Sequence, residues 1–82
     1  MNTIINLAKF VMSETEYSRF MSYLKMRLYG KLRIFVEEIM ELLIAKSILY
    51  KDDPVLEAQI VECRRLDVLV TDLYVDKLVA SP

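Results

Sequence analysis

The sequence lacks histidine and tryptophan, and it holds a single cysteine, a single glycine and two prolines among 82 residues. Without histidine, the chain cannot build a serine–histidine catalytic couple or a histidine-ligated metal centre. Because Cys63 is the only cysteine, an internal disulfide and a zinc site held by several thiolates are excluded. The shortage of glycine and proline leaves few positions for tight turns, which argues against a β-sandwich or barrel.

Long apolar runs are missing as well. No apolar stretch reaches the roughly 18 residues that a membrane span needs. The first ten residues, MNTIINLAKF, have no basic segment followed by a long apolar one, so they do not resemble a secretory signal. These absences lead us to expect a soluble protein of the reducing cytoplasm, with no membrane partner.

Apolar side chains are nevertheless abundant. Hydrophobic residues make up 55% of the chain, and the frequent residue types favour helices. A chain of this length forms one domain, which buries only about 60% of the surface of its unfolded state. Because so small a domain cannot easily hide so many apolar side chains, we expect an all-α fold that forms a homodimer or binds another protein.

Charge is distributed unevenly along the chain. Residues 1–33 carry six basic and two acidic side chains, whereas residues 34–82 carry five basic and ten acidic ones. The two halves could attract one another within a chain or between antiparallel chains, and the basic half could instead meet an acidic partner. Residues 23–33 interleave basic and aromatic side chains, as nucleic-acid-binding surfaces do. Because the basic residues are spread around the helix and the net charge is −1, we do not expect a nucleic-acid partner.

Apolar residues at steps of three and four predict a long first helix. Ser13-Glu14-Thr15-Glu16 is a capping box, so the helix should begin near residue 14. The apolar face keeps its phase across Gly30, which favours one helix over residues 14–49, weakened at Gly30, over two helices that meet there. This face comprises Tyr17, Phe20, Leu24, Leu28, Leu32, Phe35, Ile39 and Leu42.

A second helix is predicted over residues 54–78. Asp53 suits the N-cap, and Pro54 suits the first helical position because its missing N–H would be unpaired there. The short connection makes the two helices fold back as an antiparallel hairpin, which we expect to pair into a dimeric helical bundle. Residues 1–12 form either an arm or a short helix, and their apolar side chains favour packing. The second apolar face comprises Leu56, Ile60, Cys63, Leu66, Val70 and Leu73.

Asp67 stands at the edge of this second face, within roughly 60° of Ile60 and Val70 around the helix. An ionised carboxylate there must reach solvent, pair with a cation or meet a partner, because burying it alone is costly. Arg64 lies three residues earlier on the same side and could pair with it. Asp67 is therefore either a structural residue held by Arg64 or a candidate functional residue.

Two further features of the sequence could have a chemical role. Glu37, Glu38 and Glu41 place carboxylates near one another on the first helix, and such pairs can bind metal ions. Di-metal helical bundles add histidine ligands, so we interpret these glutamates as a solvated helix face and expect no metal site. Cys63 projects into the apolar face, where a thiol acts as a small hydrophobic group.

From about Lys31 onward, the chain resembles the small sporulation regulators of the Spo-zero-E-like aspartyl-phosphate phosphatase family. Those proteins are antiparallel helical hairpins with a turn that often contains Asp-Pro. Their second helix bears a Ser-Gln-x-Leu-Asp-x-Leu-Ile pattern. The matching segments here are residues 39–43, the Asp53-Pro54 turn and residues 66–70, with Tyr74 near the place of a family tyrosine.

The resemblance implies a negative regulator of sporulation-type signalling that binds a response-regulator receiver domain and promotes loss of its aspartyl phosphate. The receiver would supply the divalent metal, so no cofactor is expected on this chain. Asp67 would orient the attacking water, and a surface for the partner would comprise Cys63, Arg64, Leu66, Val70 and Tyr74.

This chain departs from the family's pattern at two positions, because Cys63 and Arg64 replace Ser and Gln. The charge of Arg64 could pin Asp67 and leave only binding. The alternative function is that of a non-catalytic helical dimer, which acts as a protein–protein interaction module or an inhibitor.

Overall fold

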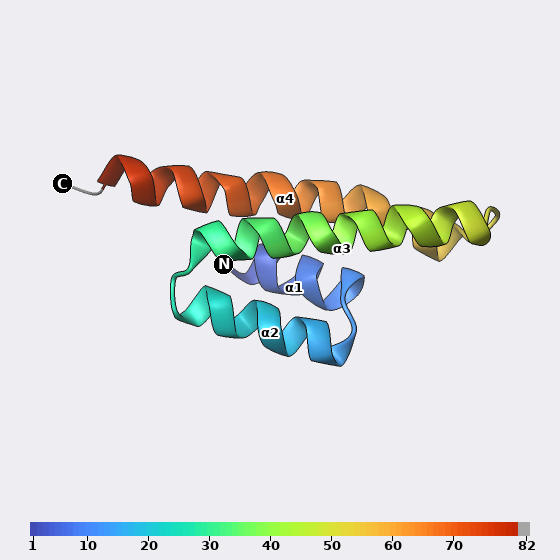
Figure 1. Ribbon diagram of the computed structural model, residues 1–82, viewed down its shortest axis with the longest axis horizontal. Helices are drawn as coiled ribbons and strands as arrows, with labels where there is room; N and C mark the ends of the chain where they lie inside the picture. The colour runs from blue at the N-terminus through green and yellow to red at the C-terminus, as the bar shows by residue number, and fades with distance from the viewer. Residues whose placement is uncertain (81–82) are drawn as a thin grey trace.

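The computed structural model describes residues 1–80, and these residues form four helices and no strand (Figure 1). The predicted all-α class is therefore confirmed. The helices are α1 (Asn2–Val11), α2 (Glu14–Lys25), α3 (Tyr29–Leu49) and α4 (Pro54–Ala80). Residues 1–12 thus contain a short helix rather than an unstructured arm, and α4 continues beyond residue 78, where the second helix was predicted to end.

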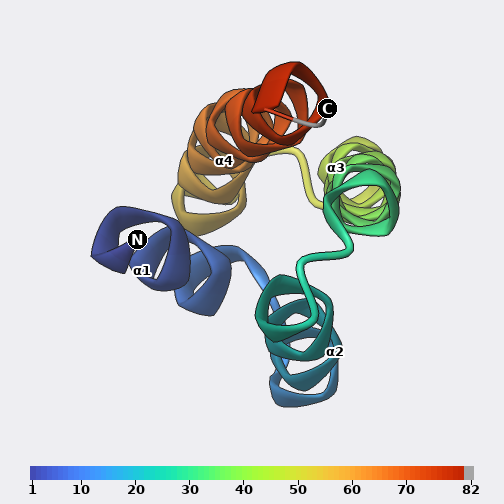
Figure 2. The same ribbon diagram turned by 90° about the vertical axis from the view of Figure 1, so that its left-hand side faces the viewer.

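The two long helices, α3 and α4, run antiparallel, and α1 and α2 lie along one half of this pair (Figure 1). Seen end on, α1 lies beside α4 and α2 lies beside α3, so that the four helices surround one core (Figure 2). The amide of Gln59 on α4 donates a hydrogen bond to the carbonyl of Phe10 at the end of α1, over 2.9 Å. The far ends of α3 and α4, near residues 50–53, extend beyond the two shorter helices (Figure 1).

The core draws on all four helices, and no polar or charged side chain within residues 1–80 is buried. Each large apolar side chain removed from water contributes about 1.5–3 kcal/mol to folding. Because α1 and α2 supply part of this core, α3 and α4 do not close it alone. The fully enclosed side chains include Ala8 of α1, Phe20 of α2, Leu32 and Val36 of α3, and Leu66 and Val70 of α4.

Two helix beginnings are capped as predicted. The Ser13 hydroxyl accepts from the Glu16 amide over 3.3 Å, and the Glu16 carboxylate accepts from the Ser13 amide over 2.9 Å. At α4, the Asp53 carboxylate accepts from the amides of Val55 and Leu56 over 3.0 and 3.2 Å. These bonds satisfy amides that the helices cannot pair internally, so both starting points follow from local sequence.

The preference for one continuous helix over residues 14–49 is wrong, because the chain reverses direction at residues 26–28. Arg27 adopts φ 56°, in the left-handed region. Its amide donates to the Leu24 carbonyl over 3.1 Å, and the Leu28 amide donates to the Tyr23 carbonyl over 3.0 Å. This pair of bonds is a Schellman motif, in which glycine usually holds the left-handed position. Here an arginine holds it.

Gly30 does not mark the break, because it lies within the first turn of α3. A Cβ at this position would stand 3.4 Å from Cε2 of the Tyr74 ring on α4. That distance is ordinary van der Waals contact, so any side chain larger than alanine would compete with the ring for space. Gly30 therefore marks the close approach of α4 to the beginning of α3.

We expect Arg27→Gly to raise the free energy of unfolding by about 0.5–1 kcal/mol. Glycine removes the steric cost of the left-handed conformation, and its greater freedom in the unfolded chain offsets part of that gain. Urea unfolding followed by circular dichroism measures the change. The control is Lys46→Gly at an exposed position inside α3, which should lower stability by about 1 kcal/mol. A loss of stability in Arg27→Gly would show that this turn carries no strain.

Candidate functional site

Asp67 of α4 lines a shallow pocket between the two long helices. Its other walls are Glu37, Met40 and Glu41 of α3, and its volume is about 210 Å³. Around α3, Glu37 lies roughly 160° from Phe35. The Phe35 ring contacts Tyr23 of α2 edge to face, with 6.0 Å between ring centroids. The pocket therefore opens on the side of the α3–α4 pair that α2 leaves uncovered.

The Asp67 carboxylate has an unusual environment for a group near the surface. Its Oδ1 atom is shielded from solvent and has no hydrogen-bond partner. Burial raises the pKa of Asp67, the negative charge of Glu37 raises it further, and the guanidinium of Arg33 lowers it in part. The folded chain therefore leaves this shielded oxygen without a donor, while the carboxylate as a whole lines the pocket.

The sequence suggested Arg64 as the cation beside Asp67, but the cation that acts on this carboxylate belongs to α3. Arg33 is the cation that lowers the pKa of Asp67. Its guanidinium carbon also lies 5.0 Å from the centroid of the Tyr74 ring, in a cation–π contact. Arg64 is exposed. The interpretation of Asp67 as a structural residue held by Arg64 therefore has no support in the geometry.

Three of the five residues expected to bind a partner are core residues instead. Cys63, Leu66 and Val70 are 0% exposed, so they cannot contact another protein while the chain is folded. Burial, together with the charge of Asp67, raises the pKa of the Cys63 thiol to about 11. At neutral pH this thiol is protonated and unreactive. The interpretation of Cys63 as a small hydrophobic group is confirmed.

We define the Asp67 surface as the residues around the carboxylate on this open side of the α3–α4 pair. On α4, Arg64 and Thr71 lie within roughly 60° of Asp67 around the helix. On α3, Ile44 follows Glu37 by two helical turns and is 40% exposed. The surface comprises Glu37, Met40, Glu41 and Ile44 of α3, and Arg64, Asp67 and Thr71 of α4. The proximity of the α3 residues to Asp67 depends on the register between the two helices, which the sequence alone does not reveal.

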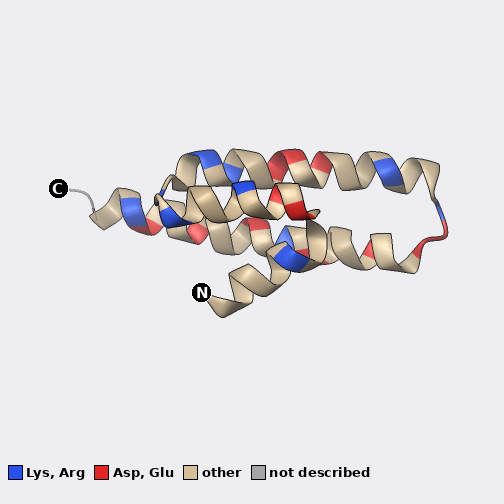
Figure 3. Ribbon diagram, turned by 90° about the horizontal axis from the view of Figure 1, so that it is seen from below, with Lys and Arg blue, Asp and Glu red and all other residues tan. Residues whose placement is uncertain are grey.

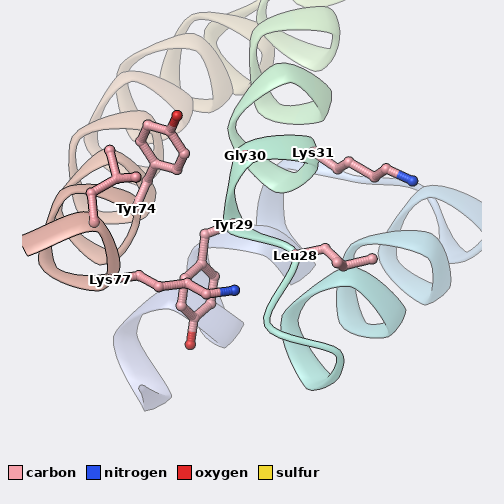
Figure 4. A pocket seen from close by; sticks show the side chains of 7 residues that line it. Leu28, Tyr29, Gly30, Lys31, Tyr74 and Lys77 are labelled. Atoms are coloured by element: carbon pink, nitrogen blue, oxygen red, sulfur yellow. The ribbon is translucent and has the colours of Figure 1, made fainter. Parts of the chain in front are cut away.

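Tyr74, the remaining predicted site residue, belongs mainly to a second cavity near the α2–α3 turn. This cavity measures about 310 Å³ and is lined mostly by apolar groups (Figure 4). The Lys77 ammonium lies 5.6 Å from the centroid of the Tyr29 ring and donates to the Arg27 carbonyl over 2.7 Å. The walls of this cavity are Leu28, Tyr29, Gly30, Lys31, Tyr74, Lys77 and Leu78.

We also searched residues 1–80 for a metal site, a membrane span and a surface of one charge. No group of three or more cysteine, aspartate or glutamate side chains in this part of the chain is placed to hold a metal ion. No helix among the same residues combines the length and the apolar character that crossing a membrane demands. On the face shown in Figure 3, basic and acidic residues are interspersed along the helices.

Comparison with known proteins adds no relative, because no protein-family model, curated protein or solved structure matches the chain significantly.

The raised pKa of Asp67 predicts how stability changes with pH. Folding favours the protonated carboxyl, so this contribution is complete below the ordinary pKa of 3.8 and is lost as the pH rises through the raised value. Above that value the carboxylate opposes folding, and Asp67→Asn removes the opposition. The stability of Asp67→Asn relative to the wild type should therefore increase from pH 3 to pH 7, as measured by urea unfolding at each pH.

The control for this measurement is Asp72→Asn, at an exposed position five residues further along α4. Its stability relative to the wild type should change less with pH than that of Asp67→Asn. If the stability of the wild type instead increased relative to that of Asp67→Asn as the pH rises, the raised pKa would be contradicted.

Proposed function

We propose that this chain is a small cytoplasmic regulator that binds a phosphorylated response-regulator receiver domain and promotes loss of its aspartyl phosphate. One observation carries the proposal: the Asp67 carboxylate lines an open pocket between α3 and α4, and its shielded Oδ1 makes no hydrogen bond within the chain. The segment of residues 66–70 supports it, because Leu66 and Val70 are buried while Asp67 faces the pocket. The apolar positions of the pattern anchor α4, and the aspartate remains available.

The proposed chemistry needs little from the chain beyond this carboxylate. An aspartyl phosphate is a labile acyl phosphate, and the receiver would bind the divalent metal that neutralises the phosphoryl oxygens. Asp67 would accept a hydrogen bond from one water and hold it in line with the phosphorus. As the water oxygen attacks, the bond between phosphorus and the acyl oxygen breaks, which releases inorganic phosphate and the receiver's carboxylate. A raised pKa makes Asp67 a better acceptor for the proton that the water loses.

Arg64 takes a different part in this proposal from the one its sequence position suggested. Its side chain is exposed and lies on the same side of α4 as Asp67. A guanidinium there can donate to phosphoryl oxygens or to a carboxylate of the receiver. Met40 and Ile44 supply apolar contact area beside it. The surface therefore combines a water-orienting group, a cation and an apolar contact area, beside the carboxylates of Glu37 and Glu41.

A second candidate function is a non-catalytic interaction module. The α3–α4 pair exposes several large apolar side chains that the folded chain does not cover, and an amphipathic helix of a partner protein could cover them. In that case Asp67 would accept a hydrogen bond from a donor on the partner and carry out no reaction. The exposed side chains include Ile34, Ile44, Ile48 and Val68.

The test of the proposed function is the decay of a phosphorylated sporulation-type receiver domain with and without the protein. The wild type should accelerate decay, and Asp67→Asn should reduce the acceleration about 10²-fold, because the amide cannot accept a proton. Binding to the receiver, measured by calorimetry, should change little. Asp72→Asn on the same helix is the matched control and should behave as the wild type does.

Two outcomes would decide against this function. Binding of the wild type to receivers without accelerated decay would favour the interaction module. An absence of both binding and acceleration across a panel of receiver domains would overturn the proposed function.

A further inference from the structure

The connection between α2 and α3 is a hinge of three residues, 26–28, with unfavourable local chemistry at both sides. On one side, Arg27 holds a left-handed conformation that favours glycine. On the other, α3 begins without a capping side chain, and its first turn has no acidic residue. Helix beginnings usually have one or both. The turned conformation of the hinge is therefore held by the Schellman hydrogen bonds and by the Lys77 bond to the Arg27 carbonyl, without a glycine at the left-handed position or a side-chain cap.

The apolar pattern of the sequence fits a second conformation of the same hinge. Leu24, Leu28 and Leu32 follow one another at four-residue steps, so a straight helix through the hinge keeps them on one face. In a straight helix, the amides of residues 29–31 would donate to the carbonyls of residues 25–27, the last residue of α2 and the first two of the hinge. Straightening would also return Arg27 to the right-handed region.

A straight hinge would carry α1 and α2 away from their own α3–α4 pair, and a second copy can restore the lost contacts. In the folded chain, α1 packs on α4 and α2 packs on α3. Two straightened copies that lie antiparallel would each place α1 and α2 on the other copy's long helices. The Gln59–Phe10 hydrogen bond and the Tyr23–Phe35 ring contact would then form between chains. Exchange of this kind creates a dimer from contacts that already exist.

The hinge end of the molecule also exposes apolar surface that a dimer would cover. The 310 Å³ cavity opens there, between Tyr29 and Tyr74 (Figure 4). Met26 in the hinge is 64% exposed, and Val79 in the last turn of α4 is 80% exposed. This turn extends beyond the beginning of α3, so no helix lies beside it (Figure 1). A straight helix over residues 14–49 would run alongside it.

We infer that two copies of this chain exchange their α1–α2 segments by straightening residues 26–28 into one helix over residues 14–49. The straight helices of the two copies, each over residues 14–49, cross antiparallel near Arg27. The cavity beside Tyr74 lies at the centre of the dimer. The exchanged α1 and α2 pack on the opposite side of the α3–α4 pair from Asp67, whereas Tyr74 lies on the same side as Asp67, about two helical turns along α4.

Light scattering after size-exclusion chromatography, over a range of protein concentrations, tests the exchange. The wild type should form a dimer whose fraction rises with concentration. Arg27→Gly relaxes the turned hinge and weakens the straight helix, so the association constant should fall about tenfold per hinge, or about a hundredfold per dimer. Arg27→Val, whose branched side chain disfavours the left-handed region, should raise it about tenfold or more. Lys46→Gly lies in a helix in both forms and should change it less than about twofold.

Cross-linking distinguishes exchange from a dimer that forms through surface contacts. Phe10→Cys and Gln59→Cys place two thiols on neighbouring parts of α1 and α4, with Cys63→Ala to remove the native thiol. A short bismaleimide should link the two positions within one chain in the monomer fraction and between chains in the dimer fraction. Links within one chain in the dimer fraction would overturn the exchange. So would a wild type that remains monomeric up to about 1 mM while keeping its helical circular dichroism.

Discussion

The close packing of α3 on α4 is the contact on which the rest of the structure depends. Cys63 lies where the two helices approach, with its sulfur 4.0 Å from the Val36 carbonyl. A small side chain at this point allows the backbones to come near, and the enclosed Leu66 and Val70 fix the register along the seam. In the family pattern on which the proposed function draws, serine stands at this position. Cysteine preserves its small size and replaces a strong hydrogen-bond donor with a weak one.

This register explains the electrostatics of the site. With the two helices held close, burial between them raises the pKa of Asp67, and the negative charge of Glu37 on α3 raises it further. Arg33 offsets part of this effect and is itself held over the Tyr74 ring. Tyr74 in turn packs against Gly30. The carboxylate is therefore tuned by groups on a different helix, which the packing of Tyr74 and the size of Gly30 place there.

Local features of the fold could be predicted from the sequence, and features set by the register between helices could not. The caps at Ser13 and Asp53 involve residues two or three positions apart, so local sequence was enough to locate them. The turn at Arg27 has no glycine or proline signal. Arg33 was overlooked because its proximity to Asp67 arises only when α3 and α4 pack. Leu66 and Val70 were expected to bind a partner, but an apolar helix face gives no indication of whether the chain itself will cover it.

The two sides of the α3–α4 pair make different contacts. One side provides the core that α1 and α2 complete, whether these helices belong to the same chain or, as we infer, to a second copy. The other side bears Asp67, and its residues contribute little to the core. Because Phe35 and Glu37 lie on different sides of α3, a change in how α1 and α2 are connected leaves the pocket walls in place. The exchanged helices and the Asp67 pocket therefore use different sides of α3, and the strain at Arg27 acts on the stability of the turned chain and on assembly.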